Sequence, residues 1–322
     1  MRNLLSGTLL ASLSILAAEA ANAQSSAGIT TYGFVEAGQS YSSGSSDSRS
    51  YYLGDFGGTY SFGNFSGADI GLDLGVFSYG SLDSGSSNLP AVVFGGVTLG
   101  IGNSKLTIGA PRAAYDLVPL SFARDGAGDQ PSPLTYVYDL SVVDLDRLLF
   151  GSHGESYGLR YDGMFSGAHV AASWNHTSIS GNSFDTYGAA VMYPVGNAVI
   201  YGATEYGRGN SGVDVRQSTL GGTYDFGKGK AGLSVAYGNV FFDSLVPNVT
   251  RVRGFVNYDV TDKLNLSADA WSVNEGSGNL HIYGIGANYK VFSNAAIKAS
   301  YARTGGGFSS NDITSIALNW SF

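Results

Sequence analysis

Apolar residues recur at every second position along most of this chain, and each such run closes at a Gly, Asn, Asp or Ser turn. The last segment shows the pattern cleanly, because one phase is apolar and the other is small or polar. Its apolar phase consists of Ile316, Leu318, Trp320 and Phe322. Successive side chains of a β-strand point to opposite faces, so a period of two predicts strands with one apolar and one polar face.

Sixteen segments follow this pattern, and most of them are nine to fourteen residues long. They span residues 29–40, 49–62, 67–79, 91–100, 103–110, 154–165, 167–178, 183–194, 197–208, 214–226, 230–242, 249–260, 264–274, 281–291, 296–304 and 314–322. A tilted membrane strand needs about 9–11 residues, whereas strands of soluble proteins average about 5–6. The lengths and the even number favour a membrane barrel over a soluble sandwich.

Short and long connections alternate along the chain. Tight turns such as 101–102 and 166–167 alternate with longer Ser/Gly-rich connections such as 42–48 and 79–90. Strands that run toward the tight turns mostly end in aromatic residues of the apolar phase, for example Tyr60, Tyr224 and Tyr289. Aromatic side chains gather at membrane interfaces. Together these features predict an all-β protein, a 16-stranded antiparallel transmembrane β-barrel.

Composition agrees with this fold class. The chain has 322 residues, 47 glycines, no cysteine, 13% charged residues and a net charge of −8. The acidic balance argues against nucleic-acid binding, which needs a basic surface.

The first residues predict a signal peptide over residues 1–23, because a basic start is followed by an apolar stretch and by the small residues of Ala21-Asn22-Ala23. The mature barrel would then span 24–322. The alternative, a membrane anchor, needs a longer apolar run.

No pattern of catalytic residues supports an enzyme. The absence of cysteine excludes a thiol nucleophile. There is no G-x-S-x-G nucleophile elbow, because the match at Gly154-Glu155-Ser156-Tyr157-Gly158 opens the predicted strand 154–165 and not a strand-to-helix turn. The histidines are His153, His169, His176 and His281, and a Ser-His pair among the many serines remains an open alternative.

Residues 111–153 interrupt the alternation for some forty positions. Four of the seven prolines fall in this stretch, and so do six aspartates. Long connections without regular structure are usually functional. This one follows the fifth strand and belongs to the side of the long connections.

The whole pattern resembles the Gram-negative general porins, and most closely the porin family of alphaproteobacteria. The resemblance rests on the cleaved signal, sixteen strands, the terminal phenylalanine and the long third loop. It implies that residues 111–153 fold inward as a constriction loop and that the protein is a homotrimer in the outer membrane. The sequence Leu318-x-Trp320-x-Phe322 is similar to the signal read by the outer-membrane assembly machinery.

The resemblance also implies an acidic loop that faces a basic barrel wall. The acidic candidates of the pore constriction are Asp116, Asp125, Asp129, Asp139, Asp144 and Asp146. The basic candidates of the pore wall are Lys105, Arg112, Arg160, Arg251, Arg253 and Lys298. Opposed charges at a narrow point favour small hydrophilic solutes and ions over apolar ones. The expected function is therefore passive diffusion, although any single inward arginine can also be a solvated wall residue.

Two other functions stay open at this point. A substrate-specific channel, for instance for sugars, would use inward aromatics such as Tyr51, Phe255 and Trp271, but these lie on separate strands. A plugged barrel would act as an adhesin or a structural protein.

No cofactor is expected. Ca²⁺ at the loop carboxylates is a weak alternative, because no EF-hand order is present. The expected partners are outer-membrane lipid and lipopolysaccharide, the assembly machinery and small hydrophilic solutes.

Overall fold

The computed structural model of the protein describes residues 28–43, 48–82, 91–118, 141–143, 155–179, 182–210, 212–241, 244–275, 278–307 and 310–322. The expected signal peptide, residues 1–23, lies outside the described residues. Within these ranges the chain forms one closed sheet of sixteen strands. None of the helices in the described ranges is long and apolar enough to cross a membrane.

The strands follow the predicted order, and most of their bounds lie within a few residues of the prediction. They are β1 (Ile29–Ser42), β2 (Ser48–Phe65), β3 (Ala68–Ser81), β4 (Ala91–Ile101), β5 (Ser104–Ala110), β6 (Glu155–Phe165), β7 (Ala168–Ile179), β8 (Asn182–Val195), β9 (Ala198–Gly209), β10 (Asp214–Asp225), β11 (Gly229–Phe241), β12 (Ser244–Asp259), β13 (Leu264–Asn274), β14 (Asn279–Phe292), β15 (Ala295–Gly306) and β16 (Asn311–Ser321).

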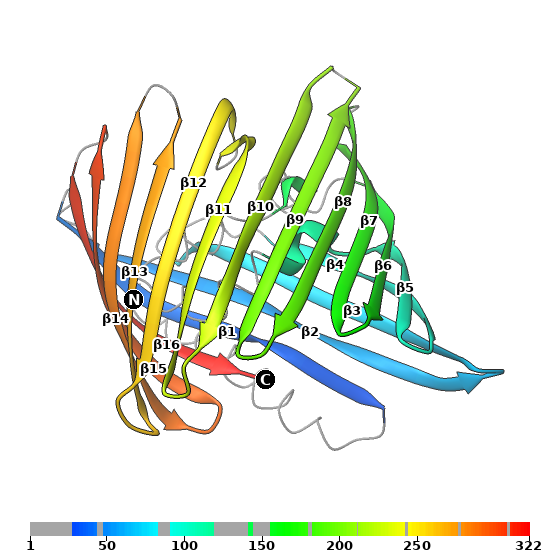
Figure 1. The fold of residues 1–322 in the computed structure, drawn as a ribbon, viewed down its shortest axis with the longest axis horizontal. Coiled ribbons are helices and arrows are strands. Elements are labelled where there is room, and N and C mark those ends of the chain that lie inside the picture. The colour runs from blue at the N-terminus through cyan, green and yellow to red at the C-terminus, as the bar shows by residue number, and fades with distance from the viewer. Residues whose placement is uncertain are drawn as a thin grey trace, which may run out of the picture.

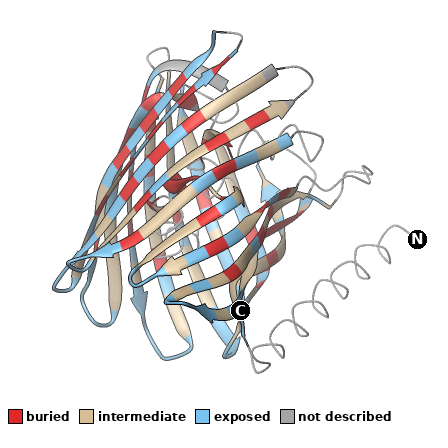
Figure 2. Cartoon of the chain, turned by 90° about the vertical axis from the view of Figure 1, so that its right-hand side faces the viewer, coloured by how far each residue is buried: buried red, intermediate tan, exposed pale blue. Residues whose placement is uncertain are grey.

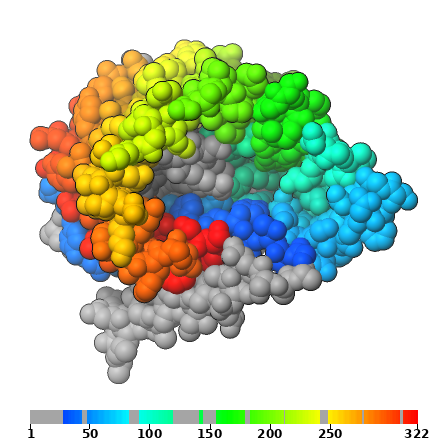
Figure 3. All heavy atoms as spheres, turned by 60° about the horizontal axis from the view of Figure 1, so that its bottom comes forward, coloured from blue at the N-terminus to red at the C-terminus, as the bar shows by residue number. Residues whose placement is uncertain are grey.

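Each strand pairs antiparallel with its neighbours in the sequence, and the last strand pairs with the first (Figure 1). At this closure Val35 lies opposite Trp320, and Ala37 lies opposite Leu318. Short turns gather at the bottom of Figure 1, as expected. Seen from the side of the short turns, the strands form a ring around a hollow (Figure 3). A closed barrel leaves no unpaired sheet edge.

The two faces of the barrel differ as the alternation predicts. Apolar residues of one phase point outward and are exposed, for example Leu220 at 66% and Ile285 at 61%. Residues of the other phase point inward, and many of them are buried polar or charged groups such as Glu205 and Arg253. Buried and exposed positions alternate along the strands in Figure 2. A lipid-facing outer surface with a polar interior has this arrangement.

One tight turn lies beyond its predicted place. The sequence predicted a turn over residues 63–66, but β2 continues to Phe65 and the turn is formed by Ser66 and Gly67. Both residues have positive φ, +53° and +88°, which suits the primed turns of β-hairpins. A register shift between Ser61 and Gly63 lets the pairing with β3 continue past the predicted end.

Strand β5 is short, with seven residues, and ends at Ala110. Pro111 follows directly and has no N–H to donate to a neighbouring strand, so the sheet cannot continue there. This proline marks the start of the long stretch that the sequence singled out.

The outward face generates a test of stability. Leu233 is 59% exposed near the middle of β11, and replacing it with arginine should lower the free energy of unfolding by about 2–4 kcal/mol in lipid. Val260 is 46% exposed directly after β12, and the same change there should cost only about 0–1 kcal/mol, as at a membrane interface. Equilibrium urea unfolding in phospholipid vesicles measures both. Equal losses would contradict the placement of Leu233 at the bilayer centre.

Candidate functional site

The first described part of the long stretch, residues 111–118, is attached to the inner wall of the barrel. The Arg160 guanidinium of β6 donates hydrogen bonds to the carbonyl oxygens of Arg112 (3.3 Å) and Ala113 (3.2 Å). The backbone N–H of Ala114 donates to Oγ of Ser173 on β7 at 2.8 Å. Ala114 begins the short 3-10 helix η2 (Ala114–Asp116), all of whose residues are buried.

Apolar packing reinforces these hydrogen bonds. Tyr115 and Val118 form one buried cluster with inward residues of β8, β9 and β12. The wall members of this cluster are Ala190, Tyr201, Ala203 and Phe255. Gly188 of β8 provides the space, because a Cβ there would lie 3.3 Å from the backbone nitrogen of Tyr115. A larger residue at this position would push residues 111–118 away from the wall.

The second described part, residues 141–143, returns to the same region. The N–H of Ser141 donates to the Asp116 carboxylate at 2.6 Å, and its hydroxyl donates to the other oxygen at 2.7 Å. The N–H of Val142 donates to Oε2 of Glu205 on β9 at 2.9 Å. Val142 also packs against an apolar cluster that includes residues of β2 to β4 together with residues of β10 and β11. The two described parts of the stretch are thus joined to each other and to the wall.

Five of the six basic candidates form ion pairs with acidic residues of the wall itself. The pairs are Lys105 with Asp73 (3.4 Å), Arg112 with Asp55 (2.8 Å), Arg160 with Asp162 (2.8 Å), Arg253 with Asp269 (3.1 Å) and Lys298 with Glu36 (3.1 Å). The strand residues among them lie on the inward phase of the barrel, next to these acidic partners. The sequence predicted basic groups that face an acidic loop, whereas in the described residues these five have acidic neighbours on the strands.

Aromatic rings and amides complete the surroundings of the arginines. Cζ of Arg112 lies 4.0 Å from the centroid of the Phe94 ring, and Cζ of Arg253 lies 5.6 Å from that of Trp271. Arg251, the sixth basic candidate, donates to Oε1 of Gln217 at 3.4 Å. Burial next to a carboxylate, an amide or a ring compensates the lost hydration of a guanidinium.

Glu36 has a structural role that sequence reasoning missed. Its carboxylate on β1 accepts hydrogen bonds from the Tyr51 hydroxyl of β2 (3.1 Å) and the Asn319 amide of β16 (3.2 Å). With Lys298 of β15 it therefore links four neighbouring strands around the closure of the barrel. Strand parity is the signal that could have identified Glu36, because it places this side chain on the inward face. Parity also places Asp55, Asp73, Asp162 and Asp269 on the inward face.

The acidic candidates of the loop divide into two groups. Asp125, Asp129, Asp139, Asp144 and Asp146 lie outside the described residues. Asp116 is described and has no exposed surface. Its carboxylate holds Ser141 and does not face the water of the lumen, which differs from the pore-lining place expected from the sequence. Charge-assisted hydrogen bonds of this length are among the strong ones, so this carboxylate holds the two described parts of the stretch together.

The residues of the expected assembly signal lie on the outer face of the last strand. Leu318 of β16 is 41% exposed, and Trp320 follows it on the same face. The N–H of Phe322 donates to the carbonyl oxygen of Gly33, and its ring lies 6.1 Å from that of Phe56. The C-terminal end is therefore part of the barrel closure.

The fold and the inner wall define a β-barrel channel protein. The family model for Gram-negative porins matches residues 8–309. This chain belongs to that family, and it is an outer-membrane, multi-pass β-barrel that forms a diffusion channel. A search of curated proteins finds no match.

Solved porin structures share the fold. A variant of the Rhodopseudomonas blastica porin with lysine, arginine, aspartate and glutamate residues replaced by alanine aligns with a TM-score of 0.62 at 16% identity, covering 91% of this chain and 100% of its own. A variant of the same porin with an alanine replaced by tryptophan gives the same values. A triple mutant with two introduced tryptophans aligns with a TM-score of 0.62 at 14% identity over the same shares of both chains.

The contact between the two described parts of the stretch can be tested at Asp116. Asp116→Ala removes the acceptor of the Ser141 N–H, and a hydrogen bond to a charged group contributes about 1.5–3 kcal/mol. Amide exchange at Ser141 should become about 10- to 100-fold faster, measured by hydrogen–deuterium exchange with mass spectrometry. Ser141→Ala is the control, because it removes the hydroxyl but keeps the N–H bond. Unchanged exchange in Asp116→Ala would refute this role.

Proposed function

We propose that residues 111–153 project into the lumen and set its narrowest passage, through which small hydrophilic solutes and ions diffuse passively. The observation that supports this is the contact of both described parts of the stretch with inward-facing side chains. Tyr115 packs with Tyr201 and Phe255, and the Val142 N–H bonds to Glu205. A connection that projected away from the barrel would have no reason to bury these groups. In a channel, width and charge at the narrow point decide what passes.

The chemistry of the inner wall supports a preference for hydrophilic solutes. Each ion pair of the wall sets a positive and a negative group side by side and orders the water next to it. A polar solute can replace the hydrogen bonds of that water, but an apolar solute displaces it without compensation. The preference therefore comes from the wall as well as from the loop.

The sign of ion selectivity follows from the charges that the wall pairs do not balance. The five described pairs are each neutral as a unit, so they add little net charge to the lumen. In the long stretch, the remaining aspartates outnumber the two further arginines, Arg124 and Arg147. We infer a cation preference that originates in Asp125, Asp129, Asp139, Asp144 and Asp146. How many of them reach the narrow point remains a prediction.

The assembly of the protein is part of the same proposal. We infer a homotrimer whose outer face contacts outer-membrane lipid and lipopolysaccharide, and whose residues Leu318, Trp320 and Phe322 act as the assembly signal. Ca²⁺ at the loop carboxylates stays a weak prediction, because those residues lie outside the described ranges. Within the described ranges, no group of three or more His, Asp or Glu side chains is arranged to hold a metal ion.

Single-channel recording in planar bilayers tests the channel function. The purified full-length protein should give large, ohmic and weakly selective steps. A substrate-specific channel would instead show current that is blocked by its solute at low concentration. A plugged adhesin or structural barrel would give no steps from folded, trimeric protein, and that result would overturn the proposal.

The origin of the selectivity can be tested by neutralisation. Changing Asp125, Asp129, Asp144 and Asp146 together to asparagine should lower the cation preference, because it removes four negative charges near the narrow point. The reversal potential in a tenfold KCl gradient should move toward zero. The control is Asp262→Asn in a short turn of the barrel. If the reversal potential of the fourfold variant equals that of the unchanged protein, these aspartates do not line the passage.

A further inference from the structure

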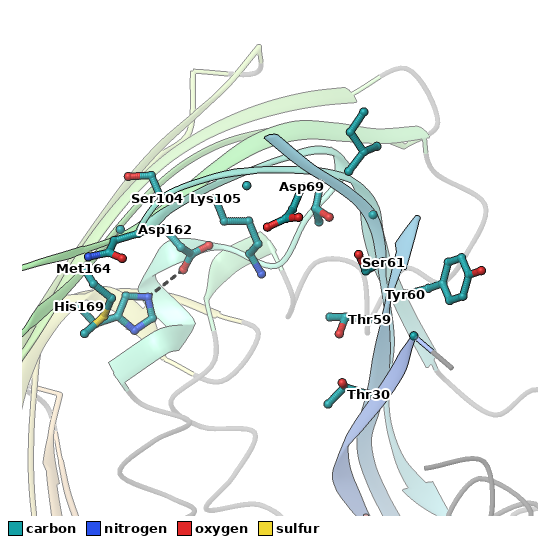
Figure 4. A pocket seen from close by; sticks show the side chains of 18 residues that line it. Thr30, Thr59, Tyr60, Ser61, Asp69, Ser104, Lys105, Asp162, Met164 and His169 are labelled. Atoms are coloured by element: carbon teal, nitrogen blue, oxygen red, sulfur yellow. Dashed lines mark hydrogen bonds and ion pairs between the residues drawn. The ribbon is translucent and has the colours of Figure 1, made fainter. Parts of the chain in front are cut away.

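A recess of roughly 620 Å³ lies in the inner wall where β1 to β7 approach the short turns (Figure 4). It is separate from the anchored part of the long stretch, since none of residues 111–118 or 141–143 lines it. Charged side chains line one side of it and hydroxyl groups the other. Figure 4 shows Lys105 and Asp69 on the charged side and Thr30, Thr59 and Ser61 across from them.

Strand register explains why opposite charges meet here. Asp69 of β3 lies opposite Gly100 of β4, and Gly100 lies opposite Lys105 of β5. Lys105 in turn lies opposite Asp162 of β6. The three charged residues therefore form one row across the wall, in the order negative, positive, negative. Because Gly100 has no side chain, none stands between Asp69 and Lys105 in this row.

These charges are accessible to a solute. The Lys105 side chain is 41% exposed, and its contact with Asp73 at 3.4 Å engages one of three N–H donors. Asp69 is exposed and accepts a hydrogen bond from the Asn64 amide at 3.2 Å. The third charge, Asp162, is held by Arg160 and His169 at the far end of the recess.

We propose that this recess is a weak subsite for zwitterionic solutes in which an ammonium group lies next to a carboxylate, as in amino acids. The ammonium pairs with Asp69, the carboxylate pairs with Lys105, and the facing hydroxyls bind further polar groups. A simple anion meets the two flanking carboxylates, and a simple cation meets Lys105. Only a solute with both charges gains charge-assisted hydrogen bonds to both sides.

Weak binding suits a channel, since a solute must enter the site and also leave it. Exposed ion pairs in proteins are worth little, so the subsite should change fluxes only a few-fold. This inference rests on the proposed function, because the recess serves a solute only if the lumen conducts. It adds the class of solute that the short-turn end of the lumen favours.

Alanine and lactamide provide the test, because they are isomers of which only alanine is a zwitterion. Swelling rates of proteoliposomes that contain the full-length protein should give an alanine-to-lactamide ratio of about three at low solute concentration. The ratio should fall to about one in Lys105→Met and, independently, in Asp69→Asn. Lys290→Met is the matched control, since this inward-phase lysine of β14 is outside the recess, and its ratio should stay unchanged.

The outcomes separate this inference from the proposed function. If lactamide passes but the ratio is one in the unchanged protein, or if the ratio in Lys105→Met and Asp69→Asn stays at the value of the unchanged protein, the subsite is refuted while the channel stands. If neither solute passes and bilayers show no current, the channel function itself fails and the subsite with it. Lactamide flux in each variant also shows that the variant is folded and open.

Discussion

Pairing between the first and last strands is the constraint on which the rest of this barrel depends. Hydrocarbon offers no hydrogen-bond partner, so each N–H and C=O of a membrane-spanning sheet must pair within the protein. Here β1 and β16 complete the ring, and Phe322 bonds to Gly33 at its end. Glu36 adds side-chain links from β1 to three other strands on the inner side of the same closure. Once the ring is closed, every strand has one face toward lipid and one toward the lumen.

The lumen face can then hold charges that would be very costly on the outer face. Most of the described basic residues of the wall share their charge with an acidic residue of the wall, often on another strand. This arrangement keeps the wall polar without giving it a large net charge. Under the proposed function, the net charge of the narrow point then comes from the long stretch. In the recess near the short turns, Asp69, Lys105 and Asp162 form one row of alternating charge.

Arg160 connects the wall to the long stretch. It pairs with Asp162 and donates to two carbonyl oxygens of residues 112 and 113, so one side chain serves both the charge balance and the loop attachment. Ser173, Gly188 and Glu205 complete the attachment from three further strands. A loop root held by neighbouring rigid strands is positioned more precisely than one held by its own chain.

The sequence by itself determined the strand number, the closed sheet and the direction of each strand side chain, because a period of two and the turn residues are local properties. It also located the long stretch, since Pro111 ends β5. Only the tertiary structure decided which charges meet. Parity assigns Lys298 and Glu36 to one face, but their contact depends on closing the ring across residues far apart in the chain. The sequence also predicted that Asp116 lines the pore, and the structure differs for the same reason. The burial of Asp116 against Ser141 depends on how the long stretch returns to the wall, and no local pattern encodes that return.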